Sequence, residues 1–114
     1  MAFYDYKIEL PAHSDVDIAL EFLLPDPGSA AHHVIDLPPG FSDYQCVDSC
    51  SKTLGKAGNL KIERTVIFSK AVNLDINNPD VNIRYLINGN LILNHTNPKS
   101  IDPSPLIKVN ITFV

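Results

Sequence analysis

The stretch that decides the fold is residues 81–96, VNIRYLINGNLILNHT. Apolar and polar residues alternate on both sides of the Asn-Gly-Asn triplet at 88–90, which is typical of a β-hairpin. Two registers compete for this hairpin. A two-residue turn pairs Ile87 with Asn90, whereas a three-residue loop pairs Ile87 with Leu91. The second register keeps one face nearly apolar, so we expect the three-residue loop, with Asn90 in the left-handed conformation.

The same alternation predicts short strands throughout the rest of the chain. They cover residues 3–10, 16–24, 30–37, 43–47, 60–69, 71–76 and 106–113. Residues 48–59 are expected to form a loop, with one helical turn within 51–57. Arg64 falls on the apolar face of its strand and therefore needs an acidic partner or an exposed position. The inward positions define an expected core of Tyr6, Ile8, Ile18, Leu20, Phe22, Ile62, Val66, Phe68, Ile83, Tyr85, Leu93, Val109 and Ile111.

Eight or nine short strands with frequent turns and no convincing helix indicate an all-β fold. We expect an antiparallel two-sheet β-sandwich of immunoglobulin-like or jelly-roll type, with the strand order left open. Residues 1–114 are expected to form a single domain, because no linker or internal repeat interrupts them.

The composition excludes several classes of protein. With 45% hydrophobic and 19% charged residues, the chain is neither disordered nor built for membrane insertion. No apolar run approaches the roughly 20 residues of a membrane-spanning helix. The first residues show no basic and apolar leader, so a cytoplasmic location is the default expectation, and the true compartment stays open.

The charges are divided unevenly along the chain. Residues 1–50 carry nine acids and one base, whereas residues 51–114 carry four acids and eight bases. The two halves either neutralise each other within one fold or join an acidic face to a basic face of another copy. The basic stretch has no phosphate-binding loop and few aromatic residues, so no nucleic-acid partner is expected.

Several apolar residues fall on the nominally outward faces of the predicted strands. They are Leu23, Ile67, Leu86, Ile92 and Val114. Leu86 and Ile92 would be cross-strand neighbours in the expected register. An apolar patch of this kind is covered by another copy, by a protein partner, or by the long segment 25–59. Our main hypothesis is a non-enzymatic assembly or interaction module. Its expected interface residues are Leu86, Ile92, Leu23, Ile67, Lys52, Lys56 and Lys61.

The loop at 75–82 concentrates oxygen-bearing side chains, namely Asp75, Asn77, Asn78, Asp80 and Asn82. Oxygen-rich loops of this kind suit calcium, and a sugar could bind there too. Asn, Asp and Pro are equally the residues of a plain turn, and the spacing does not match an EF-hand. A lectin-like carbohydrate- or calcium-binding module is therefore the alternative hypothesis. We assign no cofactor and no transition-metal site.

No arrangement of residues predicts catalysis. Within an extended segment, neighbouring side chains point to opposite faces, so neither His13-Ser14 nor His32-His33 forms one site. Cys46 and Cys50 are separated by three residues, which fits neither a redox pair nor a zinc pair. Without a visible leader, two reduced thiols are expected, with a local disulfide as the alternative.

Overall fold

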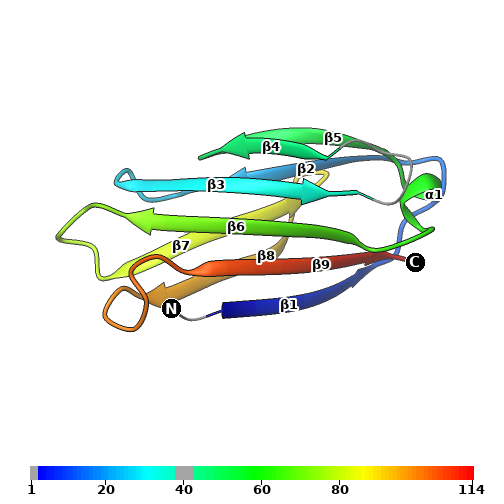
Figure 1. The fold of residues 1–114 in the computed structure, drawn as a ribbon. Coiled ribbons are helices and arrows are strands. Elements are labelled where there is room, and N and C mark those ends of the chain that lie inside the picture. The colour runs from blue at the N-terminus through cyan, green and yellow to red at the C-terminus, as the bar shows by residue number, and fades with distance from the viewer. Residues whose placement is uncertain (1–2, 38–42) are drawn as a thin grey trace.

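The computed structural model describes residues 3–37 and 43–114, which form nine strands in two sheets (Figure 1). The five-stranded sheet has the order β1 (Phe3–Leu10), β9 (Leu106–Phe113), β6 (Thr65–Asn73), β3 (Ser29–Asp36) and β4 (Tyr44–Val47). The four-stranded sheet has the order β5 (Cys50–Lys56), β2 (Asp17–Leu23), β7 (Asp80–Ile87) and β8 (Asn90–Pro98). A single helical turn, α1 (Ala57–Leu60), connects β5 to β6. The all-β prediction is confirmed.

The two sheets pack face to face around one apolar core. Aliphatic side chains from both sheets are fully buried there, and the ring of Phe22 on β2 stacks on His33 of β3 with centroids 3.8 Å apart. Neighbouring strands are antiparallel except for β1 and β9, which run parallel.

The alternation of the sequence translates directly into burial where one face of a strand is charged. On β2, Ile18, Leu20 and Phe22 are buried, while Asp17 and Glu21 are exposed. The observed bounds of β1 and β9 coincide with the predicted ones. In these strands the burial of one apolar face is sufficient to set the register.

The predicted faces of β6 are wrong. Ile67 is fully buried instead of outward, whereas Phe68 is partly exposed and Ile62 lies outside the strand. The predicted strand began at Leu60, but Leu60 belongs to α1 and Ile62 to the turn after it. The strand β6 begins only at Thr65, so its alternation does not continue from Leu60. Three consecutive apolar residues at 66–68 give either face a similar hydrophobicity, so the pattern alone does not set the phase.

Arg64 precedes β6 and is exposed, which is one of the two alternatives predicted for it. The expected loop at 48–59 is also corrected, because residues 50–56 form the edge strand β5. This strand buries only Leu54 and presents mostly polar side chains, so the sequence lacks a strand signal there. The helical turn lies at residues 57–60 and so begins at the last residue of the segment 51–57 in which it was predicted.

The β7–β8 hairpin combines both predicted registers. A two-residue turn forms, with positive φ at Asn88 and Gly89 and with Ile87 opposite Asn90, so Asn90 is not left-handed. Below the tip the register shifts, and Tyr85 lies opposite Leu93, as the three-residue loop predicts. The extra residue of this β-bulge is Ile92. The turn chemistry sets the tip, burial sets the body of the hairpin, and the bulge reconciles them.

One consequence of the bulge corrects a predicted contact: Leu86 pairs with Leu91 and not with Ile92.

The strands run along the long axis of a molecule that measures 45 × 23 × 23 Å, so the loops gather at two ends. The tip end carries the β2–β3, β6–β7 and β8–β9 connections. The pocket end carries the β1–β2 loop, α1 and the β7–β8 turn (Figure 1). These two names are used below for the opposite ends of the molecule.

Candidate functional site

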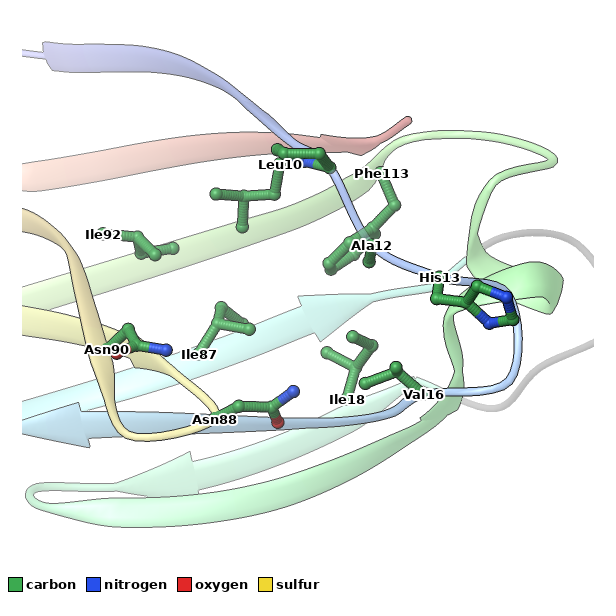
Figure 2. A pocket seen from close by; sticks show the side chains of 11 residues that line it. Leu10, Ala12, His13, Val16, Ile18, Ile87, Asn88, Asn90, Ile92 and Phe113 are labelled. Atoms are coloured by element: carbon green, nitrogen blue, oxygen red, sulfur yellow. The ribbon is translucent and has the colours of Figure 1, made fainter.

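A pocket of about 330 Å³ opens between the sheets at the pocket end (Figure 2). Its walls come from the end of β1, the β1–β2 loop, the start of β2, the β7–β8 hairpin and the end of β9. The lining is mostly apolar and consists of Leu10, Pro11, Ala12, Val16, Ile18, Ile87, Ile92 and Phe113, with His13, Asn88 and Asn90 as the polar members.

Hydrogen bonds of the β1–β2 loop and of the β7–β8 turn hold the walls of this pocket. Pro11 ends β1, and the loop that follows is fixed to the C-terminus by the Ala12 amide, which donates to the Val114 carbonyl at 3.0 Å. On the other wall, the side chain of Asn88 bonds two backbone groups of β2, at 2.8 and 3.1 Å. The bulge turns Ile92 toward the pocket. The walls are therefore held by backbone and amide hydrogen bonds and are preformed.

The chemistry of the lining suits an aliphatic group. A volume of about 330 Å³ is at the lower limit of ordinary ligand pockets, and its interior offers no charged group. His13 lies at the rim with its ring nitrogen 3.8 Å from the Asp15 carboxylate, and both side chains are largely exposed. The apolar surface thus lies inside the pocket, and the charged and polar side chains lie at its rim.

Three large aliphatic side chains are exposed at the tip end. Leu74 and Ile76 lie on the β6–β7 turn and Ile101 on the β8–β9 loop, with exposed fractions of 75%, 94% and 70%. The two loops are joined, because the Lys99 amide donates to the Pro79 carbonyl at 2.8 Å. These three side chains are called the apolar tip below.

The oxygen-rich segment predicted as a cation or sugar site forms the turn that carries Ile76. The Asp75 carboxylate accepts from the Asn77 amide at 3.0 Å, and the Asn78 side-chain oxygen accepts from the Asp80 amide at 3.0 Å. Lys99 donates to the Asp75 carbonyl at 2.6 Å. The side-chain oxygens thus organise the backbone of the turn.

Asn82, the fifth predicted ligand, lies apart from the other four. Its amide nitrogen contacts Asn94, the His95 carbonyl and Thr96 on β8. Across residues 3–37 and 43–114, no group of three His, Cys, Asp or Glu side chains is placed to hold a metal ion. Cation or sugar binding at this loop stays a prediction.

The predicted interface residues do not form one surface. Ile67 is in the core, and Leu23 and Leu86 are half-buried in the four-stranded sheet. Ile92 is also half-buried, and it lines the pocket. Val114, the remaining outward residue, is exposed at the C-terminus. Of the apolar residues predicted to face outward, Ile92 alone is among the residues that line this pocket.

The predicted interface lysines contact residues of the same chain. Lys52 lies over the Tyr44 ring, 4.9 Å from its centroid, and Lys56 pairs with Asp17 at 3.5 Å. Lys61 donates to the Ser14 hydroxyl at 3.4 Å. The Lys56–Asp17 pair joins a base of the segment 51–114 to an acid of the segment 1–50. It is therefore one example of the first interpretation, in which the two halves neutralise each other within one fold.

A serine–histidine pair that the sequence did not reveal, Ser69 and His33, lies inside the core. The Ser69 hydroxyl donates to His33 Nδ1 at 2.7 Å, and His33 Nε2 donates to the Asp48 carbonyl at 3.0 Å. Burial lowers the pKa of His33 to about 4. Ser69 and His33 are both fully buried, so this pair has no access to a substrate and acts as a structural contact.

Only the register between β3 and β6, in which His33 lies opposite Ser69, brings these two residues together. No sequence spacing signals such a pair. His32, the neighbouring residue, is exposed and contacts Gln45, which confirms that the two consecutive histidines point to opposite faces.

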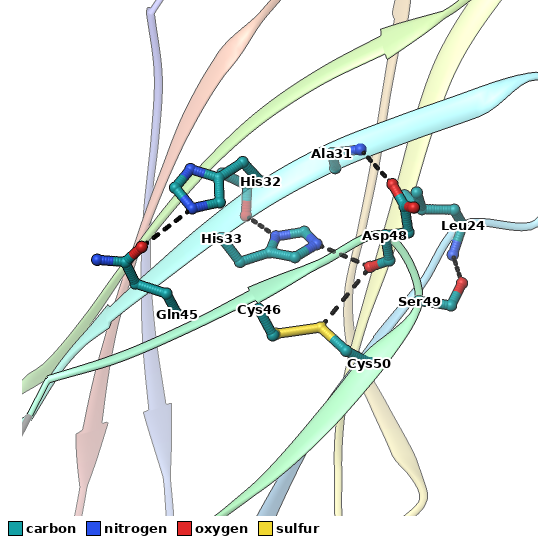
Figure 3. The surroundings of a disulfide bond; sticks show 10 residues. Leu24, Ala31, His32, His33, Gln45, Cys46, Asp48, Ser49 and Cys50 are labelled. Carbon is teal, nitrogen blue, oxygen red and sulfur yellow. Dashed lines mark hydrogen bonds between the residues drawn. A yellow bond between two sulfur atoms is a disulfide. The ribbon is translucent and has the colours of Figure 1, made fainter.

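The expectation of two reduced thiols is wrong, because Cys46 and Cys50 form a disulfide (Figure 3). The bond closes the corner at which the chain passes from β4 in one sheet to β5 in the other. A sharp turn at Asp48, with φ of 56°, brings the two Cα atoms to 6.3 Å, within bonding range. Neither cysteine is available as a nucleophile in this state.

A second buried histidine closes the gap between the free edges of the two sheets. The Tyr6 hydroxyl on β1 donates to His95 Nδ1 on β8 at 2.7 Å, and His95 Nε2 donates to the Asn97 side chain at 2.8 Å. The Tyr4 ring packs edge-on against the same imidazole. Burial lowers the pKa of His95. These contacts join β1, at the edge of the five-stranded sheet, to β8, at the edge of the four-stranded sheet.

Comparisons with protein-family models, with curated proteins and with solved structures found no match to this chain. Within the described ranges, no helix has the length and apolar character needed to span a bilayer.

Proposed function

We propose that this chain is a non-enzymatic assembly module that associates with copies of itself through the two ends of the molecule. The observation that carries this proposal is the combination of an apolar tip at one end and an apolar pocket at the other. Large exposed aliphatic side chains that gather on joined loops usually mark a contact surface. The contact thus moves from the sheet face, where the sequence suggested it, to the ends.

The chemistry of the described residues supports a binding role over a catalytic one. A hydrolase needs a nucleophile and a base that reach the substrate together. Ser69 and His33 have the required separation but lie inside the core, and Cys46 and Cys50 are bonded to each other. The pocket has an aliphatic interior with one imidazole at its rim, which suits recognition by burial.

The test is the solution mass measured by light scattering over a range of protein concentrations. We expect the mean mass to rise with protein concentration. A monomer at every concentration up to roughly 1 mM, at pH 7.5 and at low salt, would refute self-association.

We also propose that the finer type of the fold is immunoglobulin-like, with an inserted hairpin. The sheet order β9-β6-β3-β4 corresponds to G-F-C-C′, and the neighbours β5 and β2 correspond to E and B. The β7–β8 hairpin occupies the edge beside β2 where the first immunoglobulin strand would lie. The parallel pairing of β1 with β9 favours this type over the wholly antiparallel jelly roll.

A further inference from the structure

We infer that Asn94, on the outer face of β8, is a site of N-linked glycosylation. This modification goes beyond the proposed function and does not depend on it. Residues 94–96, Asn-His-Thr, match the acceptor sequence Asn-x-Thr, and so do residues 110–112, Asn-Ile-Thr. The fold separates the two sequences, because it exposes Asn94 and buries Asn110.

The first acceptor sequence lies on the side of β8 that faces away from the core. Asn94 and Thr96 are exposed, whereas His95 between them points inward and is only 1% exposed. β8 is also the edge strand of the four-stranded sheet, and within the described residues no strand pairs with its outer side (Figure 1). A glycan on Asn94 would therefore extend into solvent.

The hydrogen bonds of Asn94 leave its side-chain nitrogen free. The side-chain oxygen of Asn94 accepts from the Asn82 amide at 2.6 Å, and the Thr96 hydroxyl accepts from the same nitrogen of Asn82 at 2.9 Å. Within the described residues, no hydrogen bond involves Nδ2 of Asn94. Because an N-linked glycan is attached to that nitrogen, the glycosylated side chain keeps its oxygen and with it the contact to Asn82.

The second acceptor sequence is closed in the folded protein. Asn110 lies on β9, between β1 and β6, and is only 4% exposed. Its Nδ2 donates to the Asp5 carboxylate at 2.8 Å and to the Tyr6 carbonyl at 3.1 Å. A glycan would replace one of these two hydrogens and would need space that neighbouring groups occupy. The fold therefore excludes a glycan at Asn110.

The Cys46–Cys50 disulfide indicates a compartment in which this modification takes place (Figure 3). Disulfides form and persist in oxidising surroundings, such as the secretory pathway and the outside of the cell. N-linked glycans are attached in the same pathway. The oxidised cysteines and the exposed acceptor asparagine are independent features that point to the same history of the chain. On this inference the chain is secreted, in place of the default expectation of a cytoplasmic location.

The transfer is a substitution at the first carbon of a sugar. The donor is an oligosaccharide carried on a lipid pyrophosphate, and Nδ2 of Asn94 attacks carbon C1 of its reducing-end sugar. The bond between C1 and the pyrophosphate oxygen breaks, and the lipid pyrophosphate leaves with the bonding electrons. The nitrogen loses one proton to a base of the transferring enzyme. Since the transfer precedes the pairing of β8 with β7, the fold decides which glycosylated chains mature.

The position of Asn94 also determines what the glycan would cover. Asn94 lies opposite Arg84, near the middle of the β7–β8 hairpin and away from both the tip end and the pocket end. A glycan there would shield the free edge of β8, which is otherwise open to pairing with a strand of another molecule. The modification is therefore compatible with association through the ends.

The first experiment uses the chain purified from the cells that produce it naturally. Peptide N-glycosidase removes N-linked glycans and converts each modified asparagine to aspartate, which peptide mass spectrometry then locates. We expect conversion at position 94 and none at position 110. A folded protein that lacks the glycan at Asn94, or that carries one at Asn110, overturns the inference.

A second experiment tests the site with variants of the full chain, secreted from mammalian cells and compared by the gel mobility shift that the glycosidase removes. Asn94→Gln and Thr96→Val each destroy the acceptor sequence and should abolish the shift, whereas Thr96→Ser preserves the sequence and should retain it. Thr112→Val is the matched control, because it destroys the second acceptor sequence at an exposed residue and should leave the shift unchanged.

The outcomes of the second experiment are equally decisive. A shift that persists in Asn94→Gln and Thr96→Val, or that disappears in Thr112→Val, overturns the assignment to Asn94. Circular dichroism shows whether each secreted variant is folded. If Asn94→Gln does not fold, the comparison of Thr96→Val with Thr96→Ser still tests the site, because both variants leave Asn94 in place.

Discussion

Acidification should destabilise this fold because His33 is buried as a neutral imidazole. Its ring stacks on Phe22 with centroids 3.8 Å apart, accepts a hydrogen bond from Ser69 and donates one to the Asp48 carbonyl. Burial lowers its pKa from 6.5 to about 4. In the unfolded chain the imidazole takes up a proton below pH 6.5, whereas in the folded state it stays neutral until about pH 4. The free energy of unfolding is therefore fully retained above pH 6.5 and falls as the pH decreases toward 4.

The size of this effect follows from the two pKa values. For pKa values of 6.5 and about 4, the free energy of unfolding falls by about 2 kcal/mol between pH 7 and pH 5. The loss approaches about 3 kcal/mol at pH 4 and then levels off. Burial also lowers the pKa of His95, which adds a decrease of the same sign. Since small domains are stable by only about 5–15 kcal/mol, the decrease is readily measured.

The assay is urea unfolding followed by circular dichroism at pH 7, 6 and 5. His33→Gln removes the ionisable ring, so this variant should be less stable at pH 7 but should lose less stability on acidification. His32→Gln is the matched control, because the neighbouring side chain is exposed, and it should keep the wild-type dependence on pH. A free energy of unfolding that changes by less than about 0.5 kcal/mol between pH 7 and pH 5 would refute the reasoning.

Three further predictions concern the contacts that hold the turns and edges. Reduction of the Cys46–Cys50 disulfide should lower the free energy of unfolding by about 2 kcal/mol, the value for so short a loop, in urea unfolding with and without reductant. Asn88→Ala should cost about 2 kcal/mol, measured as a lower melting temperature, because it removes two hydrogen bonds at a position with φ of 50°. Asn88→Gly should cost less, since glycine adopts that backbone conformation. Tyr6→Phe should cost about 1 kcal/mol and speed hydrogen exchange in β1, because His95 loses its donor across the sheet edges, and unchanged exchange would contradict that role.

The parts of the fold that the sequence predicts well are strands with one apolar and one polar face. In β2, Asp17 and Glu21 mark the outer face so clearly that only one phase is compatible with burial. In β6 the polar residues on the buried face are Thr65, Ser69 and Asn73, and Ser69 is hydrogen-bonded to His33 of the neighbouring strand. A pattern read along one strand contains no information on that partner, so the phase was predicted incorrectly.

The predicted turn of the β7–β8 hairpin was wrong for a different physical reason. The sequence contains two valid signals, a turn that favours Asn88-Gly89 and a burial pattern that requires one more residue in the loop. Choosing between them was the error, because one inserted residue, Ile92, satisfies both. A β-bulge is visible in the sequence only as this conflict between turn and register.

The candidate site was the least predictable part, because its residues come together only in three dimensions. The pocket draws on five strands, the β1–β2 loop and the β7–β8 turn, and the sequence of these segments contains no motif of a binding site. The sequence did not predict the apolar tip, because the oxygen-bearing side chains of Asp75, Asn77 and Asn78 in the same turn favoured a cation site. Two of those side chains use oxygens to build the turn, and the residue they present outward is Ile76.

The position of the exposed apolar residues determines what kind of assembly the fold permits. Ile67 on β6 and Leu86 on β7 lie in different sheets, so the predicted outward apolar face that contains both residues does not exist. Ile67 is buried, and the three most exposed aliphatic side chains outside the strands at the tip end are Leu74, Ile76 and Ile101, at one end of a molecule 45 Å long. On the strands, Val47, Phe68 and Leu91 are also exposed, but they lie on three different strands of the two sheets. In the proposed end-to-end association each contact would be small in area and therefore weak, so the assembly would depend strongly on protein concentration. The stacking of one sheet on another would bury a larger area and would depend on concentration less.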